Sequence, residues 1–170
     1  MEFMSSSSSS SSFSKSNPGR MYDVFINFRG EDTRRNFVCH LHSVLSNAGV
    51  NTFLDDENLV KGMELIQLMR AIEGSQISLV VFSKNYTQST WCLTELENII
   101  KCHRLHGHVV VPIFYHVSPS DVRRQEGDFG KALNASAEKI YSEDKYVLSR
   151  WGSALTTAAN FCGWDVMKPG

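Results

Sequence analysis

Apolar residues follow two alternating patterns along this chain. Short runs rich in β-branched and aromatic residues predict strands at 22–28, 50–54, 77–83 and 109–115. Between and after these runs, apolar residues recur at the three- and four-residue spacing of a helix that buries one face. The helical stripes consist of Phe37, Leu41, Leu45 and Ala48; of Leu65, Leu68, Met69 and Ile72; of Leu96, Ile99, Ile100 and His103; and of Leu148, Trp151, Leu155, Ala158, Ala159 and Cys162.

The order of these elements indicates the fold class. Nearly continuous apolar strands that alternate with helices are typical of a parallel sheet covered by helices on both faces. Right-handed crossovers between such strands give a flavodoxin-like, doubly wound α/β fold. The pattern shows four strands, and the length of 170 residues fits a single domain.

The two ends of the chain are expected to lie outside this domain. Residues 5 to 12 are all serine, and a polyserine tract has nothing to bury. We therefore expect 1–20 to be a disordered N-terminal segment, of which 1–3 resemble a cloning remnant. The folded domain is expected at 21–165, followed by a tail at 166–170.

Composition argues against two classes of partner. The net charge of −1 provides no basic field for nucleic acid. No apolar run approaches the roughly 18 residues of a membrane span, so no membrane contact is expected. The four cysteines form no CxxC pair and fit the reduced thiols of a cytoplasmic protein.

A metal site is not expected either. Cys102, His103, His106 and His108 lie close together in the sequence. Zinc needs four convergent ligands, and this cluster lies where a predicted helix ends. A polar helix end and loop is the interpretation we adopt.

In a doubly wound sheet, ligands bind outside the carboxyl ends of the strands, where the strand order reverses. The turn after the first strand carries Arg29, Gly30 and Arg34, and exposed N–H groups with cationic side chains there can hold a pyrophosphate. One glycine is no dinucleotide fingerprint, and the two arginines fit ordinary surface positions equally well. Glu31 and Asp32 are expected to offset the helix dipole.

Trp91 and Glu95 form the second candidate. They are four residues apart and therefore lie on one face of a helix. Most glutamates on surface helices are solvated, and a lone tryptophan is usually part of the core. The spacing alone does not separate these roles from catalysis.

Several blocks of this sequence occur together, and in this order, in one family. Tyr22 to Arg34 reads YDVFINFRGEDTR, and Trp91 to Leu96 reads WCLTEL. Further matching blocks lie at 51–56, 78–86, 111–115 and 118–123. Together they resemble the plant TIR (Toll/interleukin-1 receptor-like) domain over about residues 21 to 164. The resemblance implies the TIR fold, with five strands.

The resemblance also implies an activity. In NAD⁺-cleaving TIR domains the glutamate of the second block is the catalytic carboxylate, which is Glu95 here. Arg29, Gly30, Arg34 and Trp91 would then bind the substrate. NAD⁺, or NADP⁺, is expected as substrate, with no cofactor. Nicotinamide leaves as a neutral base, so a carboxylate that stabilises positive charge on the ribose is sufficient.

Self-association is the other implied property. The first helix of plant members carries a Ser-His pair on its packing face, and Cys39 and His40 stand there in this chain. Cysteine is a weaker hydrogen-bonding group than serine, so this surface is expected to be weaker. The loop with Asp55, Asp56 and Gly62 matches another self-association element. We expect homo-oligomers, contacts with other TIR domains, and a role in plant innate immunity in the cytoplasm, or also in the nucleus.

Two alternatives compete with the NAD⁺ nucleosidase. A non-catalytic TIR–TIR interaction module remains open, although the presence of Trp91 and Glu95 favours the enzyme. A phospho-receiver needs acids at the exits of the first and third strands. Phe28, Arg29, Ser83 and Lys84 stand there, which excludes it. The product of the reaction, and whether the domain belongs to a larger receptor, are left open.

Overall fold

The computed structural model describes residues 20–55 and 65–168. The expected disordered segment, apart from Arg20, falls outside the described residues, as do Asp56, Gly62 and the last two residues of the predicted tail. The elements follow one another as β1 (Tyr22–Phe28), α1 (Gly30–Thr33), the π-helical turn η2 (Arg34–Val38), α2 (Cys39–Asn47), β2 (Thr52–Asp55), α3 (Leu65–Glu73), β3 (Ser75–Phe82), the 3₁₀ turn η3 (Tyr86–Gln88), α4 (Thr90–His106), β4 (Val109–Tyr115), α5 (Pro119–Arg124), α6 (Gly127–Ile140), α7 (Val147–Ala159) and β5 (Trp164–Val166).

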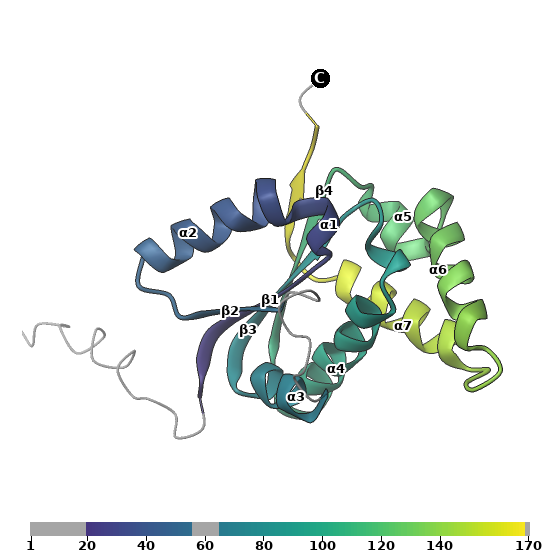
Figure 1. Cartoon of the computed structure of the whole chain (residues 1–170), viewed down its shortest axis with the longest axis horizontal. Helices are drawn as coiled ribbons and strands as arrows, with labels where there is room; N and C mark the ends of the chain where they lie inside the picture. The colour runs from purple at the N-terminus through teal and green to yellow at the C-terminus, as the bar shows by residue number, and fades with distance from the viewer. Residues whose placement is uncertain (1–19, 56–64, 169–170) are drawn as a thin grey trace, which may run out of the picture.

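The sheet confirms the predicted fold class. Its five strands are arranged in the order β2-β1-β3-β4-β5, and every neighbouring pair is parallel. The chain moves outward from β1 to β2 and then returns to the other side of β1 with β3 (Figure 1). This reversal places a switch point between the carboxyl ends of β1 and β3, where doubly wound folds bind ligands.

The four predicted strands are present: β1 and β4 have the predicted bounds, the ends of β2 and β3 are shifted by one or two residues, and the structure adds elements that the pattern did not reveal. The fifth strand, β5, has three residues and pairs with β4. α5 and α6 were not predicted. The last predicted helix ends at Ala159, so Cys162 lies beyond it and is exposed.

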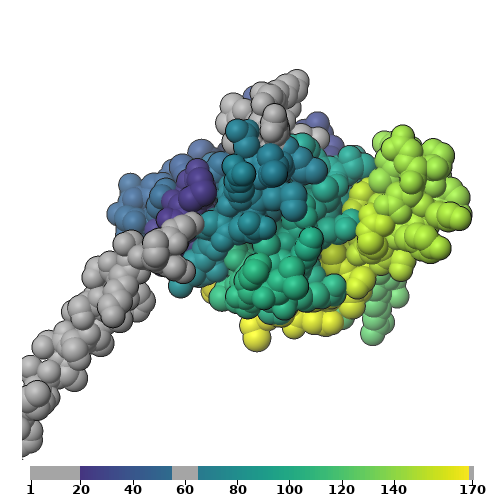
Figure 2. Space-filling model, turned by 90° about the horizontal axis from the view of Figure 1, so that it is seen from below, coloured from purple at the N-terminus to yellow at the C-terminus, as the bar shows by residue number. Residues whose placement is uncertain are grey.

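Strand residues alternate between two apolar layers. Phe25, Val80 and Phe114 point into a large core formed with α3, α4, α6 and α7. Ile26 and Val81 point into a smaller core on the other face, where η2 and α2 pack. Figure 2 shows the side of the larger layer, with α3 and α4 in the middle of the view and α6 and α7 at one end.

The smaller layer covers its face of the sheet only in part. Beside α2 lies a hollow of about 820 Å³ with a mainly apolar lining. Leu41 and Leu45 of α2 border it on one side, and Leu79, Val111 and Ile113 of the sheet form its floor. Within 20–55 and 65–168, the predicted two-sided cover is therefore complete on one face and partial on the other. No helix in these ranges is long and apolar enough to cross a membrane.

A buried polar pair lies just beyond the His-rich end of α4. Ser78 Oγ and His108 Nε2 lie 2.7 Å apart, and His103 Nδ1 is 2.8 Å from the backbone oxygen of His108. Burial lowers the pKa of His108, the neighbouring His103 lowers it further, and a backbone hydrogen bond with Ser75 acts in the opposite direction. The neutral imidazole is therefore the form that the fold accommodates.

This pair predicts a pH-dependent stability. The folded-state pKa of His108 lies below the unfolded value, so its contribution is present above about pH 6.5 and is lost as the pH falls. We expect the Tm of the wild type to fall between pH 7.5 and 5.5 by about 2 °C more than that of His108→Gln. Thermal unfolding followed by circular dichroism measures both.

The exposed His106 provides the control, because His106→Gln should keep the wild-type pH dependence. If Tm falls with pH equally in the wild type and in His108→Gln, then protonation of His108 does not contribute to the pH dependence of stability.

Candidate active site at the carboxyl ends of β1 and β3

Three chain segments meet at the switch point of the sheet. The first is the end of β1 with the turn into α1, the second is the exit of β3 with η3, and the third is the first turn of α4. Ser89 caps α4 by accepting a hydrogen bond from the Cys92 N–H at 3.1 Å. The thiol of Cys92 donates to the Phe28 carbonyl oxygen at 3.4 Å. The start of α4 is thereby attached to the end of β1.

Glu95 lies in the interior at this junction. Its side chain is 1% exposed, and Oε1 accepts a hydrogen bond from Asn27 Nδ2 at 3.1 Å. The expectation of an exposed glutamate on a surface helix is therefore wrong. The reason is its register, because Cys92 three residues before and Ile99 four residues after are buried on the same arc of α4.

The other residues of the WCLTEL block lie as helical geometry requires. Trp91 is half-buried and packs against the larger core, one turn before Glu95. Glu97 faces α7 instead, where Arg150 Nε is 3.2 Å from its carboxylate. The two glutamates therefore occupy different environments on one helix.

Asn27 and Tyr86 complete the buried cluster, and neither is singled out by the sequence pattern. Both side chains are 0% exposed. The Tyr86 hydroxyl donates to Asn27 Oδ1, and it also lies 3.2 Å from the Cys92 carbonyl oxygen. Burial raises the pKa of Tyr86 well above its usual value, with further contributions from Cys92 and Glu95.

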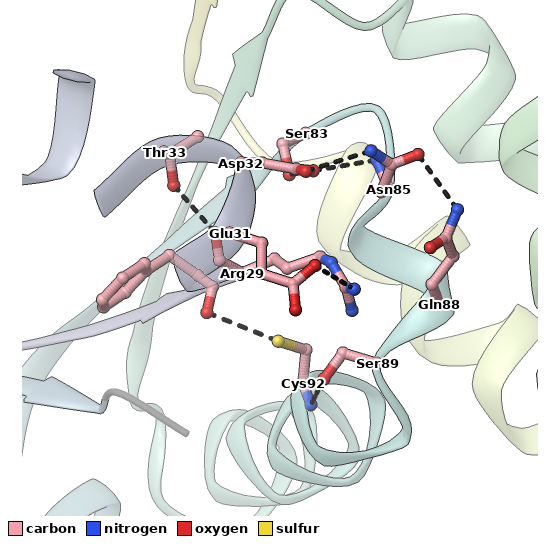
Figure 3. A network of polar contacts seen from close by, with 10 residues as sticks. Arg29, Glu31, Asp32, Thr33, Ser83, Asn85, Gln88, Ser89 and Cys92 are labelled. Atoms are coloured by element: carbon pink, nitrogen blue, oxygen red, sulfur yellow. Dashed lines mark hydrogen bonds and ion pairs between the residues drawn. The ribbon is translucent and has the colours of Figure 1, made fainter. Parts of the chain in front are cut away.

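Asp32 connects the turn after β1 to the exit of β3 (Figure 3). Its Oδ2 accepts from the Ser83 hydroxyl at 2.6 Å and from the Asn85 N–H at 2.9 Å, and its Oδ1 accepts from Asn85 Nδ2 at 3.1 Å. The sequence predicts only an action of Asp32 on the helix dipole. The structure shows that it also holds two loops together at the switch point.

Of the three residues that are expected to bind phosphate, Gly30 and Arg34 lie together and Arg29 does not join them. A methyl group at Gly30 would lie 2.5 Å from the Arg34 guanidinium, so glycine lets this arginine lie against the turn. A cavity of about 330 Å³ adjoins them, lined by Gly30, Glu31, Asp32, Arg34, Arg35 and Asn36. Arg29 instead pairs with Glu31. Its guanidinium lies 3.0 Å from the Glu31 carboxylate, beside the start of α4 (Figure 3).

Cys39 and His40, the two residues on α2 that are expected to take part in self-association, lie away from this cluster. Cys39 and His40 are exposed in the first turn of α2, which covers the opposite face of the sheet from α4. They are open to a partner. Asp55 is the last residue of β2, and Asp56 and Gly62 belong to the part of the chain that the structure does not describe.

The chain has clear relatives. A sequence model of the TIR domain matches residues 21–169. The chain is 52% identical over 149 residues to the disease resistance protein RUN1 of Vitis rotundifolia, a match that spans 85% of this chain and 11% of that protein. It is 47% identical over 161 residues to the TMV resistance protein N of Nicotiana glutinosa, spanning 94% of this chain and 13% of that one. These proteins are thus many times longer than the matching part.

A solved structure agrees with the same assignment. The TIR domains of the activated Roq1 resistosome, which directly recognises the pathogen effector XopQ, superpose with a TM-score of 0.75 at 46% identity. The match covers 85% of this chain and 87% of that one. The likeness thus includes nearly the whole folded part of the chain.

The Asp32 cluster generates a stability prediction. In Asp32→Asn, an amide replaces a carboxylate that faces three donors, so at least one of them loses its acceptor. We expect a loss of about 1–3 kcal/mol in the free energy of unfolding, measured from urea transitions with unchanged slope. Glu31→Gln is the control, because that side chain is 76% exposed and an exposed carboxylate contributes little to stability. Equal effects of the two substitutions would contradict the role given to Asp32.

Proposed function

The chain belongs to the TIR domain family, and we propose that it acts as an NAD⁺ nucleosidase in plant immune signalling, with Glu95 as the catalytic carboxylate. The observation that carries this proposal is the buried Glu95 carboxylate, held by Asn27 at the switch point of the sheet. A doubly wound fold offers its ligand site at that point. A carboxylate placed there, in surroundings of low polarity, is the group that a reaction with developing positive charge requires.

The reaction we propose is hydrolysis of the bond between nicotinamide and ribose. Water adds to the ribose carbon, neutral nicotinamide leaves, and one proton is released to solvent. The ribose passes through a state resembling an oxocarbenium ion, and the negative charge of Glu95 stabilises it. No general acid is needed, because the leaving group is uncharged once the bond is broken.

The remaining site residues suit the rest of the dinucleotide. Trp91, half-buried one turn before Glu95, offers a flat apolar surface on which a ring can stack. Gly30 and Arg34 adjoin the cavity after β1, and the guanidinium can pair with pyrophosphate oxygens. Arg29 would have to break its ion pair with Glu31 before it could bind the substrate. In this proposal NAD⁺ is the substrate, and no bound cofactor takes part.

The burial of Glu95 supports regulation by assembly. A carboxylate that is 1% exposed becomes accessible to ribose only when the segments around it move. Contacts between TIR domains can supply that movement if the assembled arrangement favours the accessible state. The similar TIR domains of the Roq1 resistosome belong to an activated assembly. By analogy we propose homo-oligomers, contacts with other TIR domains, and action in the cytoplasm or nucleus.

A second function fits the same surfaces. The exposed pair Cys39 and His40 on α2 favours TIR–TIR contact whether or not catalysis follows. A non-catalytic interaction module would use these surfaces without the carboxylate. Activity measurements on Glu95 variants distinguish the two.

Glu95→Gln should abolish NAD⁺ cleavage, with a loss of at least about 100-fold in kcat. Glutamine keeps the shape of the buried side chain and an acceptor for Asn27, but it removes the charge that stabilises the ribose cation. Glu97→Gln is the matched control on the same helix, where the lost partner is Arg150 at the surface. Nicotinamide release is measured by chromatography, and Tm confirms folding. Full activity in Glu95→Gln, or equal losses in both variants, would refute the assignment of the carboxylate.

Specific activity should rise with protein concentration, because association shifts the population toward the competent state. His40→Ala should give a folded monomer with about tenfold lower activity, partly recovered when a fused tag forces dimerisation. Asn47→Ala changes an exposed residue at the far end of α2 and should behave as the wild type. Light scattering gives the oligomeric state. Specific activity that stays constant from nanomolar concentrations upward would contradict activation by assembly.

A further inference from the structure

A buried amide near the carboxyl end of β1 is the feature that the proposed reaction leaves unexplained. Asn27 belongs to β1, whose last five residues are all buried, and it is 0% exposed. A buried amide is costly unless its hydrogen bonds are satisfied. The bonds of Asn27 therefore show why an amide stands at this position.

The direction of this amide follows from its partners. Glu95 Oε1 is an acceptor, so the group of Asn27 that faces it at 3.1 Å must be the donating Nδ2. The same Nδ2 lies 3.3 Å from the Cys92 carbonyl oxygen, a second acceptor. Oδ1 is then left for the hydroxyl of Tyr86, which must donate to it.

Tyr86 maintains this arrangement at every working pH. Burial raises its pKa well above the usual value, and Cys92 and Glu95 raise it further, so the hydroxyl keeps its proton. The donors therefore run in one direction, from the Tyr86 hydroxyl to the Asn27 carbonyl and from the Asn27 amide to the Glu95 carboxylate.

We propose that Asn27 is the positioning residue for the Glu95 carboxylate, and that Tyr86 sets the direction of the Asn27 amide. This rests on the proposed function, in which Glu95 stabilises the ribose cation. A glutamate side chain has several rotatable bonds. Fixing Oε1 from the rigid end of β1 determines where the second oxygen points. Misplacement of a reacting group by about 1 Å can cost 100-fold in rate.

The decisive variant is Asn27→Asp, which keeps the shape of the amide but replaces its donor with a carboxylate. At pH 8 the introduced carboxylate and that of Glu95 repel each other. As the pH falls, the pair binds one proton, and the introduced side chain, once protonated, donates to Glu95 as the amide did. We expect kcat relative to wild type to rise about tenfold between pH 8 and pH 5.5.

Asn27→Ala removes the donor at every pH, so its deficit of about 100-fold in kcat should not vary with pH, and KM should stay within about twofold of wild type. Tyr86→Phe frees the amide to rotate and should lower kcat by about 3- to 10-fold. Among the described residues, the titratable side chain bonded to Asn27 besides Glu95 is Tyr86, which keeps its proton, and the Cys92 thiol bonds instead to the Phe28 carbonyl oxygen. Taking the ratio to wild type at each pH removes any pH dependence that the two enzymes share.

Thr87→Val is the control for the loss of a buried polar group. Its hydroxyl donates to the Phe129 carbonyl oxygen at 2.7 Å, away from Glu95. We expect lower stability in urea with unchanged kcat. A kcat deficit in Thr87→Val as large as that of Asn27→Ala would mean that loosened packing, and not positioning, explains the loss.

Two further outcomes separate the positioning role from the proposed function. In the first, the wild type cleaves NAD⁺ and needs Glu95, but Asn27→Asp and Asn27→Ala either have equal losses of kcat at every pH or have no loss at all. That result would overturn the positioning role alone. A wild type that releases no nicotinamide at any concentration or pH would overturn the proposed function, and the role of Asn27 with it.

Discussion

The contact between the end of β1 and the first turn of α4 is the constraint on which the site depends. An ionised carboxylate is expensive to bury, and an unsatisfied amide adds to that cost. In this fold the two groups satisfy one another, since Asn27 donates to Glu95 at 3.1 Å. The Cys92 thiol and the Ser89 cap fix the same turn of α4. The helix start therefore has one position relative to the sheet, and the carboxylate is aligned with it.

The fold could be predicted from the sequence because its inner strands are largely buried. Runs such as 22–28 and 109–115 are mostly apolar, and stripes with helical spacing between them leave few other architectures. β5 could not be predicted, because it is three residues long and mostly exposed, so no apolar pattern distinguishes it. α6 was missed although it buries Phe129 and Leu133, since the rest of its buried face is glycine, serine and alanine, which give little apolar signal.

The candidate site was predictable only in part. Glu95 and Trp91 were found through a resemblance, because a glutamate on a helix carries little signal by itself. A clue to the burial of Glu95 was present in its spacing from Cys92 and Ile99. The roles of Asn27, Tyr86 and Asp32 depend on partners 51 to 68 residues away in the chain. Residue pattern describes a segment by itself, so it cannot show which distant polar groups become neighbours.

Burial of the carboxylate also gives the proposed activation by assembly a physical scale. If about one molecule in a hundred has an accessible Glu95, the monomer shows about 1% of the activity of the open state. An assembled arrangement that favours the open state by about 2.7 kcal/mol raises that fraction to one half. Contacts of this strength lie within reach of a modest interface, because the domain remains folded and only the segments around Glu95 must move. The bond that positions the carboxylate and the burial that restricts access to it thus arise from the same junction, between β1 and α4.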